Sequence, residues 1–143
     1  MLVRSLGLNQ QGTSAAFKDV AAKDWFFGAV AAATDAKIVN GFADSTFHPL
    51  EPISREEMAA MTLRALEYTG HTSSAGNEDA ILDSYKDNSS IGAWARKPIA
   101  ELMTSQIMNG MTGNQIAPKA LATRAQAVTI LKQALQSIQL INE

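Results

Sequence analysis

Cysteine is absent from the 143-residue chain, and this excludes disulfides, thiolate metal sites and cysteine nucleophiles, although it does not identify the redox compartment. A surplus of basic charge is lacking too. Twelve Lys and Arg face 14 Asp and Glu, for a net charge of −2, so no global positive field attracts a polyanion and we expect no nucleic-acid partner. No apolar run approaches the ~18 residues of a membrane helix, so we expect no membrane span.

Catalytic and metal-binding patterns are also missing. The two histidines, His48 and His71, are not spaced from carboxylates as metal ligands would be, and we interpret them as surface or loop residues. Glu56 and Glu57 are adjacent, so on a helix they point in different directions and cannot flank one substrate bond; we interpret them as capping and solvated residues. No phosphate loop or nucleophile elbow is present. The sequence predicts no enzyme activity, no metal site and no cofactor.

The chain contains an internal repeat. A shift of 69 residues pairs Trp25 with Trp94, Asn40-Gly41 with Asn109-Gly110, and Ser54-Arg55 with Thr123-Arg124. A shift of 60 residues places the segment 1–6 on the segment 61–66. Repeats of this kind stack because one unit alone cannot bury its apolar face. We therefore predict a remnant helix of a preceding repeat plus a linker at 1–16, a first full repeat at 17–70, a linker at 71–84 and a second full repeat at 85–143, the linkers having little structure of their own.

The N-terminal residues 1–7 turn polar too early for a secretory signal. The chain is then either intracellular or a piece of a longer exported chain, and the remnant helix favours the second interpretation.

Each repeat is predicted to be a helix, a loop and a second helix. Asp24 is expected to cap a first helix at 25–35, and its counterpart runs from Trp94 towards Ser105, with a late start or a kink caused by Pro98. Short extended segments at 38–42 and 107–111 then enter turns in which Gly41 and Gly110 adopt positive φ. Ser54 with Glu57, and Thr123 with Gln126, form capping boxes that start the second helices. Their apolar faces are expected to meet, which predicts an all-α fold of helix-loop-helix repeats around a central bundle.

Arg55 and Arg124 occupy the first position of these second helices, where the helix dipole disfavours a cation. A guanidinium beside free backbone N–H groups is a good receptor for a carboxylate or phosphate. The pattern therefore favours one anion site per repeat. The alternative is a structural bridge from the arginine to a carboxylate such as Asp19 or Asp87, and the spacing does not distinguish the two.

The tryptophans have two interpretations, and the aspartates are interpreted as turn residues. Trp25 and Trp94 could stack on a sugar ring, but a tryptophan that opens a packed helix is more often a core anchor. Asp19 and Asp87 are expected to stabilise the turn before the first helix.

These motifs together resemble the S-layer homology domain, whose repeat has an F-x-D-V start, a tryptophan-led helix, a G-x-x-D-G-x-F-x-P loop and an I-T-R-A-E helix start. The first repeat carries them in residues 17–20, Trp25, residues 41–49 and residues 53–57, and the second in residues 85–87, Trp94, residues 110–118 and residues 122–126. The sequence departs from the pattern at Ser45 and Ala122, which replace a glycine and an isoleucine.

The resemblance implies a pseudo-threefold prism of three repeats, incomplete here, whose grooves bind a secondary cell wall polysaccharide that often carries pyruvate ketals. It implies an extracellular anchoring module at the bacterial cell wall or S-layer, with one groove expected between the two full repeats. The implied ligand-binding residues are the motif arginines, which would engage the carboxylate, and those that line or shape the grooves: Arg55, Arg124, Trp25, Trp94, Gly41, Gly110, Asp19 and Asp87. A protein-interaction or oligomerisation module, in which a missing repeat or a second copy fills a seam beside the truncated first unit, is the alternative.

Overall fold

The computed structural model describes residues 2–8, 17–71 and 76–141. The chain divides into two compact units, Met1–Glu51 and Pro52–Glu143. Within the described ranges the regular elements are helices, and the only β pairing consists of isolated bridges. The all-α prediction is confirmed. None of the helices in these ranges is long and apolar enough to cross a membrane.

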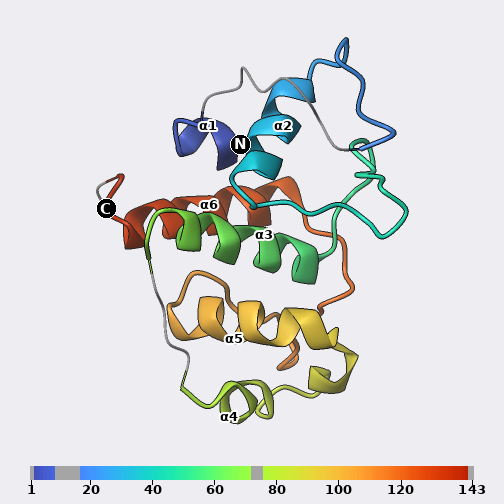
Figure 1. The fold of residues 1–143 in the computed structure, drawn as a ribbon. Helices are drawn as coiled ribbons and strands as arrows, with labels where there is room; N and C mark the ends of the chain where they lie inside the picture. The colour runs from blue at the N-terminus through green and yellow to red at the C-terminus, as the bar shows by residue number, and fades with distance from the viewer. Residues whose placement is uncertain (1, 9–16, 72–75, 142–143) are drawn as a thin grey trace. The chain divides into compact units, whose positions relative to one another are not determined.

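The first unit contains α1 (Leu2–Ser5) and α2 (Phe27–Asp35), which pack against each other (Figure 1). α1 lies within the segment 1–6, which stays a predicted remnant of a preceding repeat, and the segment 9–16 of the predicted linker lies outside the described residues. One core cluster of this unit consists of Phe17, Val20 and Val30, with Phe26, Phe27 and Phe47 packed on it.

The second unit contains four α-helices and two short 3₁₀ turns in its described part: α3 (Arg55–Tyr68), α4 (Glu78–Leu82), η1 (Asn88–Ser90), η2 (Ala93–Ala95), α5 (Arg96–Thr104) and α6 (Arg124–Ser137). α3 packs on both α5 and α6, and α4 packs on α5 (Figure 1). The contact between α3 and α6 confirms that the second helices of the two repeats meet. Aliphatic side chains from α3, α5 and α6 share one core with Leu82 of α4.

α4 lies within the segment 71–84, which we expected to have little structure. That expectation is wrong for residues 78–82. Asn77 accepts a hydrogen bond from the Ala80 N–H group at the start of this helix, and Leu82 at its end is completely buried. Burial of that side chain supplies the stabilisation that the polar local sequence does not predict.

The two repeats share one backbone path. Under the 69-residue shift, α2 coincides with α5, and α3 coincides with α6. Non-glycine residues with positive φ also recur in register, because Lys37, Ser45 and His48 match Gln106, Asn114 and Ala117. Such residues are uncommon outside glycine. Their recurrence shows that the two loops share these three left-handed positions although their sequences differ.

The first helices begin two residues later than predicted. Asp24 does not cap α2; instead its Oδ2 accepts a hydrogen bond from the Ala21 N–H group at 2.8 Å. α5 also starts late, at Arg96, with Pro98 in its first turn, where proline is tolerated. Pro98 is not the cause of that late start, however, since α2 begins at the matching residue without a proline.

The segments predicted to be extended after the first helices begin with contacts to the helix ends. The N–H groups of Ile38 and Val39 bond to the carbonyl of Ala33, and those of Ile107 and Met108 bond to the carbonyl of Leu102. All four of these side chains are buried. These contacts satisfy helix-end carbonyl groups and deliver apolar side chains to the core.

The two loop glycines share one requirement, because a Cβ would meet the Phe17 ring at Gly41 and the Tyr85 ring at Gly110, and Gly41 has a second requirement. Gly41 has a φ of +65°, and a Cβ there would lie 2.7 Å from the carbonyl oxygen of Thr46. The prediction of positive φ is therefore confirmed for Gly41. It is wrong for Gly110, which is not among the positive-φ residues; a Cβ at Gly110 would lie 2.6 Å from the ring of Tyr85, so that position needs space for the aromatic side chain.

Candidate functional site

The site is built around the start of α3. Ser54 accepts a hydrogen bond from the Glu57 N–H group, and the Glu57 carboxylate accepts one from the Ser54 N–H group, so the predicted capping box is present. Thr123 and Gln126 form the same box at the start of α6. The capping boxes place Arg55 and Arg124 at the first helical positions, as predicted.

Arg55 is 3% exposed and points into the loop of the second repeat. Its Nε donates to the carbonyl oxygen of Ile116, and its Nη2 donates to that of Asn109, both at 2.9 Å. Burial lowers the pKa of Arg55, and the charge of Asp87 opposes that shift; an arginine nonetheless stays protonated in proteins. The guanidinium is therefore a structural bridge, as the alternative interpretation predicts. Its partners are backbone carbonyl groups and not a carboxylate.

The backbone N–H groups at the start of α3 are occupied as well. Arg55 N donates to the carbonyl oxygen of Ala120 at 2.9 Å, and Glu56 N donates to that of Pro118 at 3.0 Å. The expectation of free N–H groups ready for an anion is wrong for this helix, because the second repeat supplies the acceptors. Repeat spacing could not reveal this, since the acceptors belong to a loop that is distant in the sequence.

Glu56 is buried and joins three parts of the second unit. Its Oε2 accepts a hydrogen bond from the Gly92 N–H group at 3.0 Å, and its Oε1 pairs with the Lys119 ammonium. The interpretation of Glu56 as a solvated residue is wrong. Sequence reasoning missed Glu56, Gly92 and Lys119 because the matching positions in the first repeat and α6 carry different residues, so the repeat gives no signal for them.

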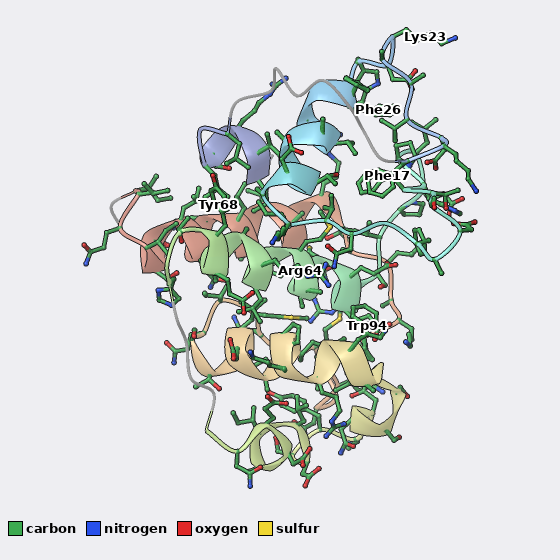
Figure 2. All side chains as sticks on the ribbon, in the orientation of Figure 1. Phe17, Lys23, Phe26, Arg64, Tyr68 and Trp94 are labelled. Atoms are coloured by element: carbon green, nitrogen blue, oxygen red, sulfur yellow. The ribbon has the colours of Figure 1, made fainter. Side chains whose placement is uncertain are left out.

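Trp94 lies beside this network with 54% of its surface exposed. It belongs to η2, which packs on α3, and its indole nitrogen lies 2.8 Å from the position of a Cβ on Gly92. Figure 2 shows Trp94 beside the end of α3 at which that helix begins. The side chain of Lys119 is 61% exposed. An aromatic face and a cation therefore border the buried Arg55 and Glu56.

The expectation that the tryptophans are core anchors is wrong. Trp25, in the first unit, is 88% exposed, even more than Trp94. Its ring contacts that of Phe26 edge to face, with centroids 5.4 Å apart. The helices start two residues after the predicted positions, and the tryptophans therefore sit on the turns that precede them, outside the packed faces.

Asp19 and Asp87 hold the ends of the two loops. Asp19 accepts hydrogen bonds from the N–H groups of Phe47 and His48, and Asp87 accepts them from those of Ile116 and Ala117, all at 2.8 Å. Desolvation would raise the pKa of Asp19, but the His48 and Phe47 N–H groups outweigh it and the pKa is lowered. Each aspartate thus stabilises the end of its loop, at residues 47–48 or 116–117, and not the turn before the first helix.

Arg124 differs from Arg55 in its surroundings. It is exposed, and within the described ranges its guanidinium has no hydrogen bond or ion pair. The structure therefore groups Arg55, Asp87, Trp94 and Gly110 around one helix start and its loop, with Arg124 at the start of α6. Trp25, Asp19 and Gly41 belong to the first unit.

Residues 16–59 and 84–128 match the S-layer homology domain, and the chain belongs to this family of cell-surface anchoring domains. Over 138 residues it is 35% identical to an endoglucanase of Bacillus sp. (strain KSM-635), covering 96% of the chain and 14% of that enzyme. It is 33% identical over 136 residues to the exoglucanase XynX of Acetivibrio thermocellus, covering 95% of the chain and 12% of the enzyme.

A cellulosome-anchoring protein of Acetivibrio thermocellus is 27% identical over 126 residues, which cover 88% of the chain and 27% of that protein. The chain thus spans only a small part of these relatives, and the enzymes match it in their S-layer homology part. The family and its surface-layer members indicate an extracellular location at the cell wall surface.

Proposed function

We propose that the chain is a non-catalytic module that anchors an attached protein by binding a secondary cell wall polysaccharide at the start of α3. The observation that supports this most strongly is that exposed Trp94 and the exposed cation of Lys119 both adjoin buried Glu56, Trp94 through its neighbour Gly92 and Lys119 through the ion pair. An indole face packs on the apolar C–H face of a sugar ring. An ammonium nearby attracts an acidic substituent of the same polymer.

The buried residues give this surface its shape. Arg55 holds the second loop through two carbonyls, and Glu56 positions both Lys119 and the Gly92 backbone. We propose that Arg55, Asp87 and Gly110 act on the ligand through the loop they hold, and that Trp94 and Lys119 touch it. Asp19, Gly41 and Trp25 have the corresponding roles in the first repeat.

The acid on the polymer is proposed to be a pyruvate ketal. Its carboxylate would be met by exposed cations, which are Lys119 at the start of α3 and Arg124 at the start of α6. The carboxylates of buried Glu56 and half-buried Asp87 already accept hydrogen bonds. This supports binding without bond cleavage.

Sedimentation with isolated cell walls tests the proposal. The chain should co-sediment with untreated walls of a surface-layer bacterium and stay in solution with walls from which the secondary polymer has been extracted. Equal sedimentation with both preparations contradicts the proposed ligand. Trp94→Ala should reduce sedimentation, while Tyr68→Ala, which removes a 53% exposed aromatic ring at the other end of α3, serves as the matched control.

A protein-interaction role is the second candidate, with a missing repeat or another copy as the partner. It is favoured by exposed apolar side chains in both units, among them Leu50 at 80% and Val128 at 51%. Surfaces of this kind often mark interaction sites when they are contiguous. Light scattering separates the candidates, because a monomer that binds wall polymer supports anchoring and an oligomer indifferent to the polymer supports the second role.

A further inference from the structure

α3 and α6 begin with the same capping box but differ in what covers them. Four residues on one face at the start of α3 are buried: Arg55, Glu56, Ala59 and Ala60. Their counterparts under the 69-residue shift are exposed: Arg124, Ala125, Val128 and Thr129. The first two turns of α6 therefore present an uncovered face, which we call the open α6 face.

The contact that covers α3 shows what the open α6 face lacks. On α3, the carbonyl groups of Pro118 and Ala120 accept the first backbone N–H groups of the helix, and Lys119 between them pairs with Glu56. On α6, the N–H groups of Arg124 and Ala125 have no acceptor within the described part of the chain. Unpaired donors are usually satisfied by another group or by water.

The chain also carries the counterpart of the covering segment. Residues 49–51 match residues 118–120, and the turn is the same because Glu51 N donates to the His48 carbonyl as Ala120 N donates to the Ala117 carbonyl. The carbonyl groups of Pro49 and Glu51 accept no hydrogen bond from any described residue. Leu50, which matches Lys119, is 80% exposed.

The side chains of the two unused halves are complementary. In the covered contact, position 119 is a lysine and position 56 a glutamate, and they form an ion pair. In the unused halves, the lysine position is Leu50 and the glutamate position is Ala125. Both members of the pair are apolar, so neither half leaves an unpaired charge against the other.

We propose that the open α6 face binds the segment Pro49–Glu51 of a second copy of this chain. Every copy carries one face and one segment, so the contact is head to tail and can join further copies or close into a ring. The face is continuous with the existing contact between repeats, because Ala122 donates to the Ile53 carbonyl two residues before α6 begins.

α1 limits the size of this contact. Under the two shifts, its residues 2–5 match 62–65 of α3 and 131–134 of α6. α1 packs on α2 as α3 packs on α5. If α6 of one copy docked on a second copy, its later turns would need the surface of α2 that α1 of that second copy already covers. The contact is confined to the first two turns of α6, and small interfaces belong to weak, concentration-dependent complexes.

Sedimentation equilibrium of the full chain tests the proposal, with no wall polymer present. The average mass should rise with concentration. Leu50→Lys alone and Ala125→Glu alone should each raise the dissociation constant by about tenfold or more, because each buries a charge without a partner. The double variant should restore association, since it recreates the Lys119–Glu56 pair. Thr104→Glu, an exposed change on α5, should leave association unchanged.

Three results would overturn the proposal. The wild-type chain could stay monomeric at every concentration at which it is soluble. It could associate with no response to either single variant. Finally, the single variants could lower stability in a chain that stays monomeric, which would place the segment on α6 of its own copy. Wall binding is measured separately, so none of these results decides the anchoring proposal.

Discussion

Nη2 of Arg55 lies 2.9 Å from the carbonyl oxygen of Asn109, a residue 54 positions further along the chain. The motif arginine at the start of one repeat's second helix therefore holds the loop of the next repeat. The same side chain bonds to the Ile116 carbonyl at the far end of that loop. One guanidinium thus spans the loop, and the binding surface proposed at Trp94 and Lys119 depends on its position.

Arg55→Ala should destabilise the second unit by about 2–4 kcal/mol, because it leaves two carbonyl groups without their charged donor. Arg124→Ala removes an exposed side chain and should change the free energy of unfolding by less than about 0.5 kcal/mol. Denaturant unfolding followed by circular dichroism measures both variants. Equal losses in the two would show that Arg55 is not a structural bridge.

Asp19 gives the first loop a dependence on pH. Its pKa in the folded chain lies below the ordinary value of 3.8, because the carboxylate accepts hydrogen bonds from the Phe47 and His48 N–H groups. Its stabilising effect is therefore complete above pH 3.8 and is lost as the pH falls through the lower folded pKa. The amide NMR signals of Phe47 and His48 should titrate with a midpoint below 3.8.

Asp19→Asn is the control for that titration and should abolish it while the rest of the spectrum is retained. A midpoint at or above 3.8 in the wild-type chain would contradict the account.

Asp87→Ala should accelerate hydrogen exchange at the amides of Ile116 and Ala117, because both lose their acceptor. We expect a loss of about 2–3 kcal/mol in local stability. Asp87→Asn keeps one acceptor oxygen and should have an intermediate effect. Unchanged exchange in the alanine variant would mean that the loop is held without the carboxylate.

Gly41→Ala should be more harmful than Gly110→Ala by about 1–2 kcal/mol, since only Gly41 combines a left-handed conformation with a close backbone atom. Gly7 has a φ of +64° with nothing within 4 Å of its Cβ position, so Gly7→Ala isolates the conformational cost. Thermal unfolding of the three variants gives the order. A Gly110→Ala loss as large as that of Gly41→Ala would show that the Tyr85 ring cannot move aside.

Local signals in the sequence were sufficient for part of the fold. The two capping boxes located the starts of α3 and α6 at Arg55 and Arg124, since the Ser or Thr and the Glu or Gln act within four residues of one another. The repeat itself was visible because turns and buried positions recur in register. The compact units divide at residue 51, inside the predicted first repeat. This division does not test the predicted repeat and linker boundaries, which stay predictions.

What failed depended on contacts between distant segments. The exposure of Trp25 and Trp94, the burial of Glu56 and the carbonyl partners of Arg55 are set by tertiary packing, which no local pattern encodes. α4 formed in a polar segment because Leu82 is buried in a core assembled elsewhere. The positions of Arg55 and Arg124 at the helix starts were therefore predictable, whereas the network around Arg55 was not, and the ligand-binding roles of the arginines and tryptophans stay predictions.

Titration calorimetry with purified, pyruvylated secondary wall polymer is the most direct measurement of the anchoring function. The wild-type chain should bind the polymer, and Trp94→Ala should weaken binding by about tenfold or more with no change in thermal stability, because that side chain is exposed. Removal of the pyruvate from the polymer should weaken binding further. Wild-type affinity in the Trp94→Ala chain would contradict the account.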